Sequence, residues 1–345
     1  MTYRSTRRAL AALALATAIA CAAAACSSSG SSTSTSGTGV GSGGTIKLVA
    51  YSTPQAAYQQ IEAAFQKTAA GKGVHFQESY GASGDQSRAV AAGQPADYVA
   101  FSLEPDVTRL VKAGLVASNW NANQYKGMVT DSVVVFIVRK GNPKHIHTWD
   151  DLTKSGVQVL TPNPFSSGSA RWNIMAAYGA QLKQGKTPAE AQQYLEKLFK
   201  NVVVQDSSAR NALTTFTNGK GDVLLDYEND AIFAQQKGQA VDYVIPDQTI
   251  LIENPAAVTV KASNPALAKA FLAFVYTPTA QKIFADNGYR PVVQGVVPAD
   301  KFVTPPDLFT IEYLGGWTAV TKQFFDAKDG IVTKIEQSNG VSTSS

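Results

Sequence analysis

The feature that most constrains this chain is a turn, rich in proline and serine, that joins a predicted strand to a predicted helix. It lies within residues 161–173 and is followed by an apolar helical face that begins at Ala170. Ser167 or Ser169 can cap this helix, and Gly168 lets the backbone approach a ligand closely. The first N–H groups of a helix lack intrahelical acceptors and lie at the positive end of its dipole. The turn is therefore either an ordinary capped helix start or an anion site.

The same pattern recurs at three other places. The predicted strands 46–50, 74–77 and 202–205 are each followed by serine, threonine or glycine and then by a helical pattern. Ligands of open α/β sheets bind outside the carboxyl ends of the strands. The four turns can therefore converge, and together they favour a site for one tetrahedral anion over four unrelated helix caps.

Strands and helices alternate from Ile46 onward, which predicts an α/β fold. The longest apolar run of the mature chain, 131–139, reads as a buried strand that is long enough to cross between two lobes. Residues 250–260 read as the return crossing. We expect residues 45–131 and 254–345 to form the first lobe and residues 132–253 to form the second.

The N-terminal segment has the pattern of a secretory leader. Residues 1–25 begin with three arginines and continue with an apolar stretch that is too short to predict a membrane span. The small residues before Cys26 resemble a bacterial lipobox, in which the cysteine is acylated and becomes the N-terminus. Cys21 is the alternative lipidated cysteine, because small residues also precede it. Residues 26–44 are rich in Ser, Thr and Gly, which predicts a flexible tether. Both cysteines lie in this region, so the rest of the chain has no disulfide.

The charge balance bears on the class of ligand. The leader holds three of the 30 basic residues and no acidic residue, so the remainder has 27 basic and 26 acidic side chains, a net charge of +1. This balance argues against nucleic acid and against a polybasic membrane surface as partners. If an anion is bound, local geometry rather than bulk charge must hold it.

Other motifs give little support for catalysis or for a metal. His145 and His147 have no third ligand at a suitable spacing, and there is no nucleophile elbow or Walker sequence. Ser167 has no evident base. Asp226 and Glu228 lie two residues apart, so a carboxylate pair for acid–base chemistry stays open. We expect no metal, no cofactor and no enzymatic activity.

Eight short segments between Ile46 and about Phe325 carry a resemblance, and they occur in the same order as in a known family: 138–144, 149–152, 163–173, 199–202, 221–224, 289–291, 309–311 and 315–317. In these segments the chain resembles the periplasmic sulfate- and thiosulfate-binding proteins that serve ABC importers. The resemblance implies a type II periplasmic-binding-protein fold, in which crossing hinge strands join two α/β lobes. It also implies a dehydrated sulfate between the lobes, held by backbone N–H groups, serine hydroxyls and one indole N–H.

Carried over residue by residue, the resemblance assigns seven sulfate-binding positions. They are Ser52, Ser83, Ser167, Gly168, Ser169, Ala209 and Tyr227.

Three of these positions depart from the family. Ser52 and Thr53 stand where the family has Asp-Pro, and Ser169 replaces a glycine; both changes preserve a backbone donor. Tyr227 replaces the tryptophan whose indole N–H reaches the anion. A phenol can donate one hydrogen bond but can also accept one. Three readings of Tyr227 follow. It replaces the indole as a donor to sulfate, it adapts the pocket to another oxyanion, or it is a core tyrosine whose hydroxyl bonds elsewhere.

The expected protein is a sulfate receptor that is lipid-anchored on the outer face of the cytoplasmic membrane. It would deliver sulfate to the permease of an ABC transporter as a monomer and bind no nucleic acid. The alternatives are a receptor for thiosulfate or molybdate, and an anchored ester hydrolase that uses Ser167 with Asp226 or Glu228.

Overall fold

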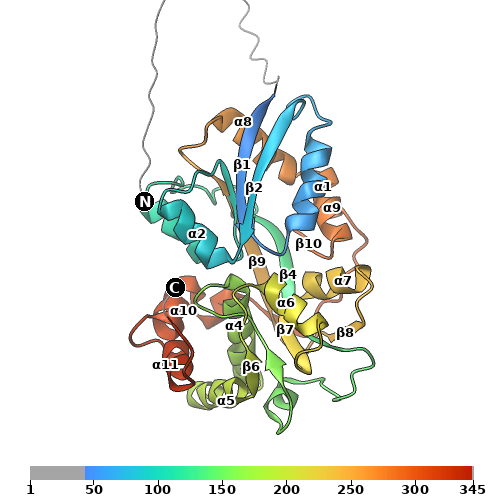
Figure 1. The fold of residues 1–345 in the computed structure, drawn as a ribbon, viewed down its shortest axis with the longest axis vertical. Coiled ribbons are helices and arrows are strands. Elements are labelled where there is room, and N and C mark those ends of the chain that lie inside the picture. Colours follow the sequence, from blue (N-terminus) through green and yellow to red (C-terminus); the bar gives the residue numbers. More distant parts are fainter. Residues whose placement is uncertain (1–42, 344–345) are drawn as a thin grey trace, which may run out of the picture. The chain divides into compact units, whose positions relative to one another are not determined.

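The computed structural model describes residues 43–343, in which strands and helices alternate as expected for an α/β protein. The leader, the two cysteines and nearly all of the predicted tether lie outside these residues. The strands follow the order β2-β1-β3-β9-β4-β7-β5-β6. The fold is two-lobed, and β4 and β9 belong to both lobes (Figure 1).

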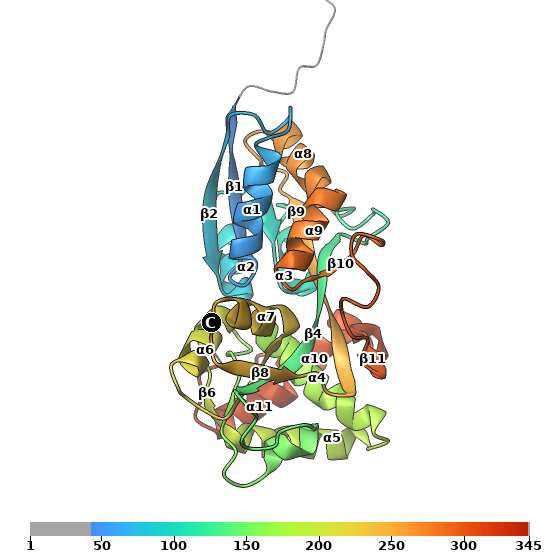
Figure 2. The same cartoon turned by 90° about the vertical axis from the view of Figure 1, so that its right-hand side faces the viewer.

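The first lobe is built on three parallel strands. Strand β1 lies between β2 and β3, and the antiparallel β9 extends the sheet beyond β3. Helices α1, α8 and α9 pack together on one side of these strands (Figure 2). The elements are β1 (Gly44–Tyr51), α1 (Gln55–Phe65), β2 (Val74–Gly81), α2 (Ser83–Ala91), β3 (Tyr98–Ala100), α3 (Glu104–Lys112), α8 (Pro265–Val275) and α9 (Pro278–Asp286).

Two long antiparallel strands cross between the lobes, as the apolar runs predict. Strand β4 (Met128–Arg139) pairs with β9 (Gln248–Val258), and the short β10 (Arg290–Pro291) pairs with β4. The boundaries expected at 131/132 and 253/254 fall inside this pair. Because both strands are continuous there, the residue at which one lobe ends stays a prediction.

The second lobe places β7 between β4 and the parallel strands β5 and β6. Its elements up to β9 are the 3-10 helix η1 (Trp149–Thr153), β5 (Val159–Leu160), α4 (Gly168–Lys183), α5 (Pro188–Asn201), β6 (Val202–Val204), α6 (Ala209–Thr217), β7 (Val223–Tyr227), α7 (Glu228–Gln236) and β8 (Val241–Val244). Thr187 starts α5 with a capping box completed by Glu190, and Pro188 follows at the first helical position.

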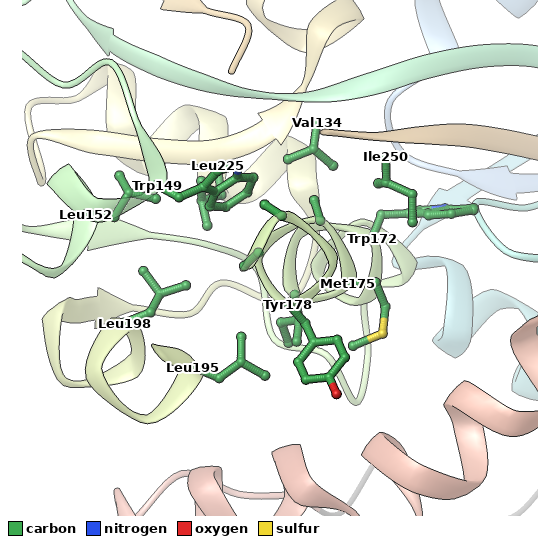
Figure 3. Packing of buried hydrophobic residues seen from close by; sticks show 14 of the residues in the cluster. Val134, Trp149, Leu152, Trp172, Met175, Tyr178, Leu195, Leu198, Leu225 and Ile250 are labelled. Carbon is green, nitrogen blue, oxygen red and sulfur yellow. The ribbon is translucent and has the colours of Figure 1, made fainter. Parts of the chain in front are cut away.

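Helix α4 is the centre of the second lobe. It has almost no polar face, and its buried residues lie on all sides, as expected for a helix that is surrounded by other elements. Figure 3 shows Trp172, Met175 and Tyr178 of this helix among side chains from β4, α5, β7 and β9. This packing fixes the position of α4. The turn that precedes α4 is therefore held in place where it joins the N-terminus of the helix.

The C-terminal segment packs differently from the expected division. It contains β11 (Asp307–Phe309), the 3-10 helix η2 (Ile311–Leu314), α10 (Gly316–Phe325) and α11 (Ile331–Ser338). Trp317 meets Trp172 of α4 edge to face, with 4.7 Å between ring centroids, and Phe324 meets Tyr178 in the same way. These contacts place the segment in the hydrophobic cluster of the second lobe, whereas the sequence had assigned all of 254–345 to the first.

Candidate functional site

A small cavity lies between the lobes, where strands of the first lobe end and helices of both lobes begin. Its volume is about 10 Å³, which is room for about one water-sized sphere. The lining consists almost entirely of small residues: Tyr51, Ser52, Gly81, Ala82, Ser83, Ser102, Ser167, Gly168, Ser169, Ser208 and Ala209. The first lobe contributes the ends of β1, β2 and β3, and the second contributes the starts of α4 and α6. Such a space is far smaller than the pockets of about 300–1,000 Å³ that hold larger organic ligands.

Six of the seven sequence-predicted positions line this cavity. The exception is Tyr227, which lies behind the lining. The predicted convergence of strand-to-helix turns is therefore seen in the structure. The sequence argument missed Ser102, although this residue also follows a predicted strand and carries a small hydroxyl group, the signal that identified the other turns.

Three helices begin at the cavity. Helices α2, α4 and α6 have Ala82, Ser167 and Ser208 as their N-caps, and the residues that open them line the space. The N–H groups of a first helical turn have no intrahelical acceptor and carry the positive end of the helix dipole. Three such ends aimed at one small space favour an anion there.

The serine hydroxyls fall into two groups. Ser83 donates to Asp106 Oδ2 at 2.7 Å, and Ser169 donates to Asp226 Oδ1 at 3.1 Å, so these two hydroxyl protons are already used. Their backbone N–H groups are what they can offer to a ligand. Ser167, by contrast, makes no side-chain capping bond although it is the N-cap of α4. Its hydroxyl is therefore free to donate into the cavity.

No charged side chain lines the cavity. Arg210 follows Ala209, but it donates to the carbonyl of Thr53 at 2.7 Å and pairs with the buried Asp230 at 3.1 Å. Burial raises the pKa of Asp230 to about 6, an effect that the nearby Arg210 opposes. Burial, together with Asp230, raises the pKa of Asp226 well above its usual range. The uncharged form of Asp226 is thus favoured, which limits repulsion of a bound anion.

The residues considered for catalysis are not arranged for it. Asp226 and Glu228 do not line the cavity, and Glu228 is paired with Arg290 at 2.7 Å. Among the residues that the structure describes, Ser167 makes no side-chain capping bond and no base is hydrogen-bonded to its hydroxyl. Within residues 43–343, no group of three or more His, Cys, Asp or Glu side chains could hold a metal ion.

Tyr227 contacts the cavity only through a neighbour. Its side chain is fully buried, and its phenol oxygen lies 2.6 Å from the Oγ of Ser102. Ser102 lines the cavity. The assignment of Tyr227 as a direct ligand contact stays a prediction, but the geometry connects it to the site.

The two lobes touch around the cavity. The N–H of Gly84 in α2 donates to the carbonyl of Ser166 at 2.9 Å, and Arg88 donates to the carbonyl of Phe165 at 3.1 Å. Gly168 lies so close to Ser102 that a Cβ added to it would be 2.5 Å from the Ser102 Oγ. The described conformation is therefore closed, and glycine at position 168 permits this approach.

Comparison with known proteins gives consistent matches over most of the chain. Residues 46–290 match the family model described as bacterial extracellular solute-binding protein. The sulfate-binding protein of Synechococcus elongatus is 42% identical over 86% of this chain and 89% of its own length. The thiosulfate-binding protein of Pseudomonas aeruginosa is 36% identical over 80% of this chain and 88% of its own length.

A solved structure agrees in fold. The sulfate-binding protein SubI from Mycobacterium tuberculosis is 46% identical and superposes with a TM-score of 0.80, covering 82% of this chain and 99% of its own. Among residues 43–343, no helix is long and apolar enough to cross a membrane.

Proposed function

The chain belongs to the family of bacterial extracellular solute-binding proteins, and we propose that it captures sulfate between its two lobes and delivers it to an ABC importer. The observation that carries the proposal is a small cavity between the lobes, at which three helices begin and which no charged side chain lines. The similarity to sulfate-binding proteins supports the choice of sulfate among small anions.

The lining can compensate for the water that a dianion would lose. Moving an unpaired dianion out of water is very costly unless each oxygen gains hydrogen bonds. Hydrogen bonds to a charged oxygen are stronger than neutral ones, and donors that are already fixed need no ordering when the ligand arrives. The proposed donors are the hydroxyl of Ser167 and the N–H groups of Ser52, Ser83, Gly168, Ser169 and Ala209.

The same lining favours sulfate over hydrogen phosphate. Hydrogen phosphate carries a P–OH proton that needs an acceptor, and a lining that presents donors leaves this proton unpaired. Thiosulfate is the second candidate ligand, because a protein named as a thiosulfate-binding protein aligns with most of this chain.

We further propose that the protein is a non-catalytic monomer held at the membrane by acylation of Cys26, with the transporter permease as its partner. Cys26 and the alternative Cys21 lie outside the described residues. The proposal rests on the leader pattern, the small residues before Cys26 and the polar tether after it.

Titration calorimetry of the anion-free protein tests the proposed ligand. Sulfate should bind more tightly than thiosulfate, molybdate and phosphate. Absence of sulfate binding would refute the proposal, and tighter binding of thiosulfate would assign the protein to the second candidate ligand. A parallel assay with aryl sulfate and aryl phosphate esters should show no turnover; turnover that is lost in Ser167→Ala would indicate a hydrolase.

A further inference from the structure

Ser102 is a serine of the cavity lining to which neither the sequence nor the helix starts assign a role. It follows β3, is 1% exposed, and lines the cavity. Its Oγ faces the start of α4, since a Cβ added to Gly168 would lie 2.5 Å from that oxygen. The hydroxyl of Ser102 is thus held among the proposed sulfate donors.

The backbone of Ser102 is fixed from three directions. Its N–H donates to the Oγ of Ser83 at 2.9 Å, within the first lobe. Its carbonyl accepts from Nε1 of Trp172 in α4 at 2.9 Å and from Nδ2 of Asn254 in the crossing strand β9 at 3.1 Å. With both backbone groups used, the hydroxyl is the only polar group that Ser102 can offer to a ligand.

The phenol of Tyr227 gives this hydroxyl a direction. The two oxygens are 2.6 Å apart, and either could donate. The phenol is fully buried, and burial raises its pKa, so it stays protonated and its proton needs an acceptor. The Ser102 Oγ lies within hydrogen-bond distance and can accept that proton, so we take the phenol as the donor of this bond. The proton of Ser102 is then left to point into the cavity.

We propose that Ser102 donates a hydrogen bond directly to the bound anion and that Tyr227 is a positioning residue that turns Ser102 into a donor. This inference rests on the proposed binding of sulfate. It assigns the two residues different roles: Ser102 contacts the ligand, and Tyr227 acts through Ser102.

The arrangement has a consequence for selectivity. A serine hydroxyl can donate and accept, so on its own it would also accommodate the P–OH group of hydrogen phosphate. In this site the phenol of Tyr227 occupies the acceptor side of Ser102. Without the phenol proton, Ser102 can rotate and accept a hydrogen bond from a ligand. Tyr227 should therefore contribute more to the preference for sulfate over phosphate than to sulfate affinity itself.

Calorimetry with sulfate and with phosphate at pH 8, where phosphate keeps one P–OH proton, tests both roles. Ser102→Ala should weaken sulfate binding by about 10- to 100-fold, the usual effect of losing a hydrogen bond to a charged group. Tyr227→Phe should weaken sulfate binding less but reduce the ratio of sulfate to phosphate affinity. Adding Tyr227→Phe to Ser102→Ala should cause little further loss of sulfate affinity.

Tyr58→Phe is the matched control. Tyr58 is also a buried tyrosine, and its hydroxyl bonds that of Tyr98 at 2.9 Å in the core of the first lobe, away from the cavity. This variant should leave sulfate affinity and the sulfate-to-phosphate ratio unchanged. Thermal unfolding of each variant without ligand checks folding. If Ser102→Ala alone fails to fold because it leaves the phenol unpaired, comparison of the double variant with Tyr227→Phe still gives the contribution of Ser102.

The outcomes separate the two proposals. If the unmodified protein binds no sulfate, the proposed function and this inference both fail. If it binds sulfate and Ser102→Ala binds as tightly, only the inference fails. If Tyr227→Phe loses as much sulfate affinity as Ser102→Ala and the two losses add in the double variant, the phenol contacts the anion itself and the positioning role is wrong.

Discussion

A methyl group added at position 168 should impair closure of the two lobes without unfolding either of them. In the closed conformation, the new Cβ of Gly168→Ala would lie 2.5 Å from Oγ and 2.7 Å from Cβ of Ser102, and 2.8 Å from Cγ of Leu103. Both of these residues belong to the first lobe, whereas position 168 opens α4 in the second. The backbone at 168 is not left-handed, so alanine fits the helix itself.

The magnitude follows from where the clash can be relieved. Overpacking by one methyl group costs about 1–3 kcal/mol in a packed site. In the open, ligand-free protein the lobes can separate and avoid this cost, so it falls on ligand binding rather than on folding. Sulfate affinity should then fall roughly 5- to 150-fold.

Gly179→Ala on the same helix is the matched control. There the added Cβ would lie 2.4 Å from two ring carbons of Phe309, inside the second lobe and away from the cavity. This variant should lower the thermal unfolding temperature by a few degrees and leave sulfate affinity unchanged. Gly168→Ala should show the opposite pattern, measured by calorimetry with sulfate and by thermal unfolding without it. Small-angle scattering should show less compaction of Gly168→Ala on adding sulfate.

Two results would refute this reasoning. Unchanged sulfate affinity in Gly168→Ala would mean that Ser102 and the start of α4 do not meet in the liganded protein. A loss of ligand-free stability as large as that of Gly179→Ala would mean that the contact belongs to the fold and not to closure.

Three further predictions concern other parts of the chain. Ser167→Ala should weaken sulfate binding by about 1.5–3 kcal/mol in calorimetry but keep its unfolding temperature, because the Ser167 side chain does not cap α4; unchanged affinity would exclude its hydroxyl from the site. Burial and the neighbouring Glu253 raise the pKa of Asp131 to about 7, so its contribution to stability is complete below about pH 4 and is lost as the pH rises to 7. Between pH 5 and pH 8, the thermal unfolding temperature should therefore fall less with rising pH in Asp131→Asn than in the unmodified protein. The same pH dependence in both proteins would contradict this. Cys26→Ser should release the protein from the membrane in a fractionation assay. If only substitution of Cys21 releases it, Cys21 is the lipidated residue.

Local sequence predicted the parts of the site that local physics controls. The strands before Ser52, Ser83 and Ser167 and the helices after them follow from apolar periodicity, small residues and helix-start signals. The convergence of Ser52 and Ser83 follows from the rule that parallel strands end at one edge of a sheet, whereas Ser167 follows a strand of the other lobe that runs in the opposite direction. These features depend on residues that are close together in the chain, which is why they could be read from the sequence.

The tertiary structure decided which groups are available to a ligand. The hydroxyls of Ser83 and Ser169 donate their hydrogen bonds to Asp106 and Asp226, which lie 23 and 57 residues away in the chain, and not to a ligand. Tyr227 meets Ser102, a partner 125 residues away, instead of lining the cavity. The sequence does not indicate such pairs, because each depends on how elements distant in the chain pack together.

The same reason explains the position of the C-terminal helices. Trp317 and Phe324 show that α10 has an apolar face, but any apolar surface of the right shape could cover such a face. Only the folded chain shows that α4 provides this surface, through Trp172 and Tyr178. The sequence determined the elements and the kind of site, and long-range packing determined which lobe each element joins and which protons face the ligand.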